Sequence, residues 1–324
     1  MHIFHIIYVV TRKGKGWSRV SFFWGWVHLM PTLKPQIVCL KDPFCSFNVI
    51  LLPWIAKVMA MRLIDYIEER QRLGKLWFTK SEALAQLGCT KDALKQAIYN
   101  LIEKKRLVLI RGEFVLIIPF EFKGWGIVPA DYFIDPLMKY LELPYYIALL
   151  SAGQLHGAAH QKPMQFQVMT NQYLREIKHG RIHVRFMQNN NMTSVPTQRV
   201  QVKTGYAIAA TPEATAFDLC KYYKASGYWN NVGTVLMELI EVVDSKKLCQ
   251  LATSGIYDTA IIQRLGYILS RPEIEGASFA TDLYSAVQNR NFRWVPLNPE
   301  QKDEPIIKDD QWKILINENI EVDL

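Results

Sequence analysis

The sequence predicts an α+β protein, with an N-terminal winged helix-turn-helix followed by a mixed α/β domain that has a small, mostly antiparallel sheet and a helical C-terminal part. Two observations support this prediction. Between residues 61 and 120, three helical patterns precede two β-rich runs that meet at a glycine. Between residues 166 and 211, four segments alternate like strands, and helical patterns flank them on both sides.

The chain has 324 residues, which leaves room for about two domains and additional segments. Half of the residues are hydrophobic and 21% are charged, so the chain can bury a substantial core. We expect four consecutive parts: a poorly ordered or spurious N-terminal extension (1–60), a winged-helix DNA-binding domain (61–122), an α/β domain (123–290) and a C-terminal tail (291–324).

The N-terminal extension contains an apolar stretch, residues 44–61, that raises the question of a membrane span. Pro53 is expected to break a helix there, and Asn48 and Lys57 interrupt the apolar run, so no spanning helix is predicted. We expect this segment to lie outside the folded unit, with Met61 as the candidate start of translation.

Positive charge is concentrated near the N-terminus of the chain, whose net charge is +8. Residues 1–60 contain seven Lys/Arg and one Asp, and residues 61–123 contain twelve Lys/Arg and eight acids. The remaining residues contain nineteen Lys/Arg and twenty-one acids. A surface that binds an anionic partner such as nucleic acid is therefore expected in the N-terminal part.

The cysteines are five, dispersed and without a CxxC pair: Cys39, Cys45, Cys89, Cys220 and Cys249. This spacing argues against a disulfide framework and against a zinc ribbon. We therefore expect reduced thiols, no metal and no cofactor, in a cytoplasmic protein.

Two helices joined by a short turn are predicted between residues 79 and 104. Thr79 is a candidate N-cap with Glu82 three residues later, as in a capping box, and Gly88 ends that helix. Thr90 is the next N-cap. The apolar stripe after it consists of Leu94, Ala97, Ile98, Leu101 and Ile102. An earlier helix, ending near Gly74, carries Leu63, Ile64, Ile67 and Leu73 at helical spacing.

The segment 106–119 is predicted to form a β-hairpin, or wing, around Arg111-Gly112-Glu113. In a winged helix the second helix of the pair enters the major groove of DNA, and lysine and amide side chains contact phosphates and base edges. The DNA-binding candidates are Thr79, Lys80, Thr90, Lys91, Lys95, Gln96, Tyr99, Asn100, Lys104, Lys105 and Arg111. The alternative is a winged helix that contacts proteins, with its lysines as an ordinary solvated face.

The α/β domain is predicted to begin with two helices, one with Pro136 in its first turn and one that starts at Pro144. Strands are expected at 166–170, 181–187, 199–204 and 206–211, the last two joined by a tight turn. A helix follows with Thr211 as N-cap and Pro212 at its first position, and further helices come after it.

Four segments of this region, taken in order, resemble the body of the AbiEi antitoxins. They are YIALLSAGQLHGAAHQKPMQFQVMT, GRIHVRF, TPEATAFDLCKYY and NNVGTVLMELIE. The resemblance extends from about residue 61 to about residue 270, and it implies the antitoxin and transcriptional regulator of a type IV toxin–antitoxin or abortive-infection system. In that family the winged helix represses its own operon. The C-terminal domain counteracts a nucleotidyltransferase-type toxin without forming a stable complex.

His156 and His160 are four residues apart, a spacing at which one helix face could hold a metal ion. The residues between them are Gly, Ala and Ala, and no Asp or Glu occurs between Leu143 and Arg175. Gly157 is also suited to end the helix. We therefore predict no metal site here, and a scaffold or partner-contact role for the two histidines.

A basic cluster is predicted on the strand 181–187 and the residues before it: Arg175, Lys178, His179, Arg181, His183 and Arg185. It is either a solvated sheet face or a nucleic-acid or toxin-substrate contact that carries antitoxic activity. Under the second interpretation Arg181 and Arg185 are the antitoxicity candidates, together with the two histidines.

Enzymatic signatures are weak. Glu213 and Asp218 could suggest paired carboxylates, but their five-residue spacing does not place them side by side on a helix. No nucleophile elbow, P-loop or dinucleotide fingerprint occurs. We expect a non-catalytic regulator of phage-defence type that binds the inverted repeats of its own double-stranded operator and does not bind a membrane. The alternatives are a metal-dependent, nuclease-like enzyme in the α/β domain, and a protein-interaction module with a vestigial winged helix.

Overall fold

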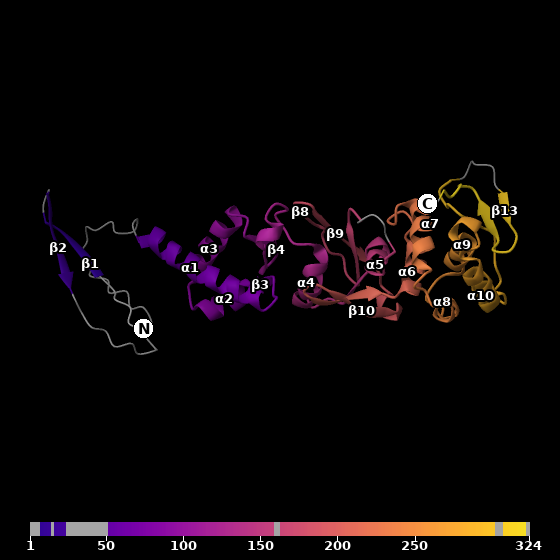
Figure 1. The fold of residues 1–324 in the computed structure, drawn as a ribbon, viewed down its shortest axis with the longest axis horizontal. Helices are drawn as coiled ribbons and strands as arrows, with labels where there is room; N and C mark the ends of the chain where they lie inside the picture. The colour runs from indigo at the N-terminus through magenta and orange to yellow at the C-terminus, as the bar shows by residue number, and fades with distance from the viewer. Residues whose placement is uncertain (1–6, 14–15, 24–50, 159–162, 302–306, 322–324) are drawn as a thin grey trace. The chain divides into compact units, whose positions relative to one another are not determined.

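The computed structural model describes residues 7–13, 16–23, 51–158, 163–301 and 307–321, with side-chain packing from residue 62 onward. The chain divides into two units, Met1–Val49 and Ile50–Leu324, and each is described by itself. In the first unit, strand β1 (Ile7–Lys13) pairs antiparallel with β2 (Gly16–Phe23). The second unit contains all the other labelled elements in Figure 1.

The second unit begins with three helices and three strands, which we call the head. They are α1 (Leu51–Arg72), β3 (Trp77–Thr79), α2 (Lys80–Leu87), α3 (Lys91–Glu103), β4 (Leu107–Arg111) and β5 (Phe114–Ile117). The helix break predicted at Pro53 is wrong, because Pro53 lies in the first turn of α1, where its missing N–H has no helical acceptor to lose. Leu73 lies beyond the end of α1 and is exposed rather than part of the apolar stripe.

The predicted helix ends within the head are confirmed. The Thr79 hydroxyl accepts a hydrogen bond from the backbone N–H of Glu82 (3.1 Å), and the Glu82 carboxylate accepts one from the N–H of Thr79 (2.9 Å), which completes the capping box. The Thr90 hydroxyl accepts from the N–H of Ala93 (3.3 Å) and so caps α3. The stripe of α3 is buried at Leu94, Ala97, Ile98 and Leu101.

Strand β5 separates two hydrophobic cores. It lies in the centre of an antiparallel sheet with the order β3-β5-β4, and β4 and β5 form the predicted hairpin. Successive residues of a strand point to opposite faces. Val115 and Ile117 accordingly join the core of the head, whereas Phe114 and Leu116 join a core that they share with the body.

The body comprises the elements from residue 120 onward. Its α-helices are α4 (Ile134–Tyr140), α5 (Leu149–Leu155), α6 (Pro212–Lys221), α7 (Tyr228–Leu239), α8 (Ser245–Thr253), α9 (Thr259–Leu269) and α10 (Ala277–Val287). Its 3-10 helices are η1 (Phe120–Phe122), η2 (Ala130–Tyr132), η3 (Met192–Ser194) and η4 (Pro272–Ile274). Its strands are β6 (Tyr145–Ile147), β7 (Phe166–Thr170), β8 (Ile177–His179), β9 (Ile182–Gln188), β10 (Thr197–Val202), β11 (Gly205–Ala210), β12 (Val295–Pro296), β13 (Ile307–Asp309) and β14 (Ile314–Ile316).

The main sheet of the body has six strands in the order β10-β11-β6-β7-β9-β8. The pairs β10/β11, β6/β7 and β8/β9 are antiparallel, and the pairs β11/β6 and β7/β9 are parallel. The α+β class is confirmed, with a sheet that is more mixed than predicted. The four expected strands are β7, β9, β10 and β11.

The helix predicted to begin at Pro144 is wrong in its first part, where β6 runs through the interior of the sheet. Tyr146 belongs to the core on one face of the sheet, and Tyr145 and Ile147 belong to the core on the other face. A strand buried on both faces shows no alternation of apolar and polar residues, so periodicity cannot separate it from a buried helix. Helix α5 begins only at Leu149.

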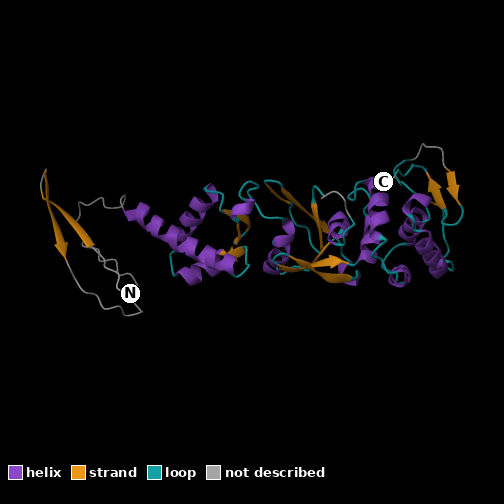
Figure 2. Cartoon of the chain, viewed as in Figure 1, coloured by secondary structure: helices purple, strands orange, loops and turns teal. Residues whose placement is uncertain are grey.

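Each face of the six-stranded sheet is covered (Figure 2). One face packs against α5 and α6, and α7 to α10 extend the same core away from the sheet. The other face packs with α4, η2 and the outward side of the β4–β5 hairpin. The hairpin of the head is thus also a structural element of the body.

Residues 291–301 and 307–321 pack against the helices before them. Strands β12, β14 and β13 form a small sheet, and the fully buried Trp312 belongs to the largest core. Its ring lies 6.0 Å from that of Phe292 and 5.3 Å from that of Tyr284. The segment that the sequence separates as a tail therefore completes a core that begins some 145 residues earlier, at Tyr146.

The structure also bears on the questions of a membrane span and of disulfide bonds. Among the described residues, no helix has both the length and the apolar character that crossing a membrane requires. Cys89, Cys220 and Cys249 carry free thiols, whereas Cys39 and Cys45 lie outside the described residues.

Candidate nucleic-acid interface

Helix α3 presents a polar face opposite its buried stripe. Lys91, Lys95 and Tyr99 follow one another at four-residue intervals and are all exposed. Gln96 and Asn100 form the neighbouring row, with Gln96 exposed and Asn100 half-buried. The structure therefore brings together five of the predicted DNA-binding residues on one helix face.

The two amides of this face are linked to each other. The Gln96 Nε2 donates to the Asn100 Oδ1 at 3.1 Å, which leaves the Gln96 carbonyl as an acceptor and the Asn100 amide N–H groups as donors. Paired donors and acceptors of this kind suit recognition of base edges in the major groove. Tyr99, a residue that is 57% exposed, adds an aromatic surface beside them.

The DNA-binding candidates on either side of this face differ in exposure and in hydrogen bonding. Lys104 and Lys105 are exposed after the end of α3, and Lys80 is half-buried at the start of α2. The Thr79 and Thr90 hydroxyls cap helices as acceptors, so each keeps its O–H as a donor.

Arg111 does not extend from the hairpin as a free cation. Its Nη2 donates to the backbone carbonyl of Arg175, and its guanidinium carbon lies 5.7 Å from the ring centre of Phe186. Burial, together with the charge of Arg175, lowers the pKa of Arg111. The side chain predicted to reach DNA from the wing tip instead ties the hairpin to the body.

The rest of the hairpin tip also contacts the body. The Glu113 N–H donates to the Tyr140 hydroxyl at 3.1 Å, and the Tyr140 ring packs on Phe114. Gly112 has a φ of +57°, and a Cβ there would lie 2.8 Å from the Tyr140 hydroxyl oxygen, so both backbone conformation and space require glycine.

The predicted basic cluster lies on the β8–β9 hairpin and at Arg175, two residues before it, and part of its charge is neutralised. The Glu176 carboxylate accepts from Lys178 Nζ (2.8 Å) and from His183 Nε2 (2.9 Å). These two hydrogen bonds lower the pKa of Glu176 to about 2. His183 therefore does not share a free basic face with the arginines. Arg181 is exposed and Arg185 half-buried, and within the described part of the chain neither has an ion-pair partner.

His156 lies at the C-terminal end of α5. Its Nε2 is 2.8 Å from the Ala210 carbonyl, and the Gln198 Nε2 is 3.5 Å from its Nδ1, an arrangement that fits a neutral ring with the proton on Nε2. Burial lowers the pKa of His156. The chain leaves the helix at Gly157, which has a φ of +85°. His160 lies outside the described residues.

A buried hydrogen-bond network, which the sequence did not reveal, surrounds Asp218. Tyr257 donates to the Asp218 Oδ1 (3.0 Å) and Tyr146 to its Oδ2 (3.2 Å). The Asn189 Nδ2 in turn donates to the Tyr146 hydroxyl (3.1 Å). Glu213 is engaged elsewhere, accepting from the Asp244 N–H (3.0 Å), so the two carboxylates do not act as a pair.

Among the residues that the structure describes, no three His, Cys, Asp or Glu side chains are grouped so that they could hold a metal ion. In that part of the chain nothing favours the metal-dependent nuclease alternative.

The comparison with protein families concerns the body. Residues 146–271 match the family model of the AbiEi antitoxin C-terminal domain. This segment is similar to the AbiEi antitoxin C-terminal domain, and we call it the AbiEi domain. The resemblance seen in the sequence is thereby confirmed over these residues, which run from within β6 to beyond α9 and include His156, Arg181, Arg185 and Asp218.

A solved structure gives a likeness of fold that extends beyond the AbiEi domain. The crystal structure of the RV2827C protein from Mycobacterium tuberculosis superposes with a TM-score of 0.58, over 80% of this chain and 91% of that one, at 15% identity. At this identity the match concerns the fold alone. No curated protein matches the chain.

The Asp218 network of the AbiEi domain predicts a pH dependence of stability. Burial raises the pKa of Asp218 to about 6, against the smaller opposing effects of Tyr257, Lys221 and Tyr146. Between about pH 4 and pH 6 the folded chain holds a proton that the unfolded chain has released. The free energy of unfolding should therefore fall as the pH rises through this window, by about 3 kcal/mol.

Urea unfolding of the wild type and of Asp218→Asn between pH 4 and pH 7 measures this contribution. The decline should be absent from the variant and present in Asp310→Asn, whose carboxylate is exposed. If the free energies of unfolding of the wild type and Asp218→Asn changed in parallel with pH, the buried carboxyl group would not be the source of the pH dependence.

Proposed function

We propose that the chain is a cytoplasmic DNA-binding autoregulator and the antitoxin of a type IV toxin–antitoxin system. The head acts as a winged helix that binds the inverted repeats of its own operator, and the AbiEi domain counteracts a nucleotidyltransferase-type toxin without a stable complex. The protein needs no cofactor and no catalysis for either task. The observation that carries the DNA-binding part is the exposed polar face of α3, combined with the basic charge of the head.

The residues of the head have distinct roles in this proposal. Lys91 and Lys95 bind phosphates at the N-terminal half of α3, and Gln96 and Asn100 contact base edges. The Thr79 and Thr90 hydroxyls and the other lysines of the head (Lys80, Lys104 and Lys105) add backbone contacts at the groove edges. Arg111 is a positioning residue, because its hydrogen bond to the Arg175 carbonyl fixes the wing against the body.

Nuclease protection of the DNA upstream of the reading frame by the full chain tests the operator part of the proposal. Protection of two related half-sites, centred about one helical turn or a multiple of it apart, is the expected pattern for a winged helix on inverted repeats. Protection that is uniform along the fragment, or none at all, would count against it.

The AbiEi domain is proposed to neutralise the toxin through the free arginines of the β8–β9 hairpin. Replacing both Arg181 and Arg185 by alanine should abolish rescue of cells that express the toxin encoded in the neighbouring reading frame. The reason is that these arginines have no intramolecular carboxylate among the described residues, so their charge is available to an anionic partner. Growth on co-expression is the measurement.

Lys178→Ala is the matched control for this experiment. Lys178 lies on the same hairpin, but its charge is already paired with Glu176 at 2.8 Å. Rescue should persist in this variant. Full rescue by a stably folded double-arginine variant would mean that the hairpin is only a solvated sheet face.

A further inference from the structure

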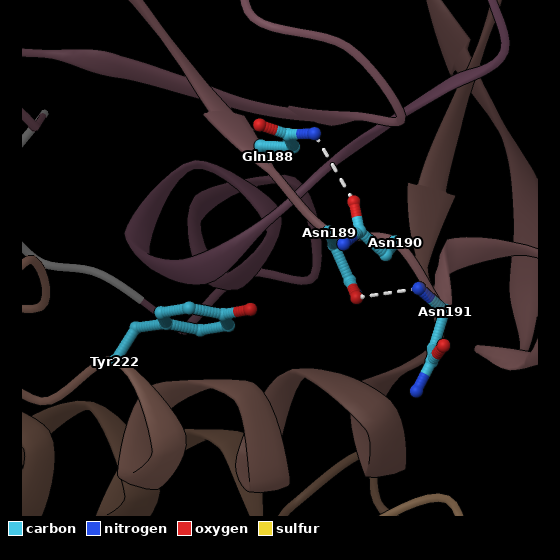
Figure 3. A pocket seen from close by; sticks show the side chains of 5 residues that line it. All are labelled: Gln188, Asn189, Asn190, Asn191 and Tyr222. Carbon is cyan, nitrogen blue, oxygen red and sulfur yellow. Dashed lines mark hydrogen bonds between the residues drawn. The ribbon is translucent and has the colours of Figure 1, made fainter.

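A pocket lined by amides lies at the end of β9. Four consecutive side chains, Gln188, Asn189, Asn190 and Asn191, line it together with Tyr222 from the C-terminal end of α6, and its volume is about 300 Å³ (Figure 3). We call it the amide pocket. Its size is at the lower limit for small-molecule sites, and none of its five lining side chains carries a charge at neutral pH.

The loop that forms this pocket is held in place by the body. Asn189 is buried: its Nδ2 donates to the Tyr146 hydroxyl (3.1 Å), and its Oδ1 accepts from the Asn191 N–H (3.1 Å). The Asn189 N–H donates to the Thr170 carbonyl at the end of β7 (2.9 Å). The amide loop therefore keeps one shape before any ligand arrives, which lowers the entropic cost of binding.

The remaining polar groups of the pocket are available. The Gln188 Nε2 donates to the Asn171 carbonyl (3.3 Å) and to the Asn190 Oδ1 (3.1 Å), so the Gln188 carbonyl and the Asn190 amide N–H groups stay free. Within the described part of the chain, the Asn191 side-chain amide and the Tyr222 hydroxyl have no hydrogen-bond partner. Figure 3 shows Tyr222 reaching toward the amide loop from the opposite side of the pocket.

These groups suit a planar, uncharged ligand with neighbouring donors and acceptors along one edge. Asn and Gln amides pair in this way with nucleobases, and bases that are not in a duplex stack on tyrosine rings. A phosphate or a metal ion alone would find no opposite charge on the lining. A cation for a phosphate lies nearby: Lys221 Nζ is 5.3 Å from the Tyr222 ring centre.

We propose that the amide pocket binds an unpaired nucleobase, with Tyr222 as the stacking surface and Gln188, Asn190 and Asn191 as the groups that recognise its edge. The base comes from a single-stranded nucleic acid or from a free nucleotide. This site lies in the AbiEi domain and does not depend on binding of duplex DNA by α3.

Binding of the four ribonucleoside 5′-monophosphates to the full-length protein, measured by saturation-transfer NMR, tests the proposal. At least one should bind saturably in the millimolar range, whereas ribose 5-phosphate, which lacks the base, should not. A single-stranded oligonucleotide that carries the preferred base should displace it, and a blunt duplex should not. If only the free nucleotide binds and the oligonucleotide does not displace it, the source of the base is a nucleotide.

Substitutions of the lining residues test whether the nucleotide binds in the amide pocket. Tyr222→Leu should weaken it about tenfold or more, because stacking on the aromatic ring is lost, and Tyr222→Phe should retain it. Asn191→Ala should also weaken it; since this side chain has no partner within the described residues, the variant should fold, which thermal unfolding checks. Gln201→Ala, an exposed amide on β10, and the double variant Lys91→Ala/Lys95→Ala should bind like the wild type.

Three results would overturn the proposal: no saturable binding of any monophosphate, equal binding of ribose 5-phosphate, or unchanged binding by Tyr222→Leu and Asn191→Ala. Duplex binding measured on the same samples separates these results from a failure of the proposed operator binding, because the head variants affect only the latter.

Discussion

Replacing Lys91 and Lys95 by alanine should weaken operator binding about 10- to 100-fold at physiological salt, because we propose that each lysine contributes a charge-assisted hydrogen bond to a phosphate. The loss should be similar for specific and unrelated duplexes. The plot of log affinity against log salt concentration should become less steep by about one unit for each contact removed. Both side chains are exposed on α3 and Thr90 caps the helix, so the double variant should fold like the wild type.

Lys246→Ala/Lys247→Ala is the matched control. It removes the same two charges from another exposed lysine pair, at the start of α8 in the body. If this control flattened the salt dependence as much as the α3 variant, binding would be a property of net charge. If neither variant changed it, the phosphate contacts would lie elsewhere on the molecule.

Trp312→Ala should destabilise the protein by about 3–5 kcal/mol, the cost of removing a large buried aromatic side chain. The Trp312 ring is fully buried between the rings of Tyr284 and Phe292. A Cβ built on Gly266 of α9 would lie 2.3 Å from the Trp312 ring, so the indole occupies the space that this glycine leaves open. Urea unfolding monitored by far-UV circular dichroism measures the loss.

Trp294→Ala provides the comparison within the same C-terminal segment. Trp294 is 39% exposed, and the Nζ atoms of Lys308 and Lys313 lie 5.5 Å and 4.8 Å from its ring centre. Its removal should cost about 1 kcal/mol or less, the range of an exposed cation–π contact. Equal, small losses for both tryptophans would mean that residues 291–324 behave as a tail and do not complete the core.

Local features of the head could be predicted from the sequence. The capping box of Thr79 and Glu82, the Thr90 cap, the apolar stripe of α3 and the hairpin turn each depend on residues a few positions apart. Each of these signals can be recognised within a short stretch of sequence, without knowledge of the rest of the fold. The exposed face of α3 followed from them directly.

Long-range packing could not be predicted in the same way. The sequence near Arg111 gives no sign of its partners, because the Arg175 carbonyl and the Phe186 ring lie 64 residues or more along the chain. The strand β6 was mistaken for a helix because its three residues are buried on alternate faces of the sheet. In both cases the missing information was which segments become neighbours.

The amide pocket and the Asp218 network also depend on contacts between segments that are far apart in the sequence. "QNNN" at 188–191 has the composition of an ordinary polar loop, and only the fold brings it opposite Tyr222 and over Tyr146. The sequence places only Glu213 near Asp218 as a candidate partner, whereas the partners in the fold, Tyr146 and Tyr257, lie 72 and 39 residues away. A buried hydrogen-bond network of this kind leaves no periodic trace in the sequence.

The proposed function requires that the head recognise a particular DNA sequence. Its most direct test is a competition titration of the full-length protein, at physiological salt, between the duplex upstream of its own reading frame and a scrambled duplex of the same composition. We predict that the upstream duplex binds at least about 10³-fold more tightly. Equal affinity for the two duplexes would contradict a sequence-specific regulator and leave only non-specific attraction by a basic surface.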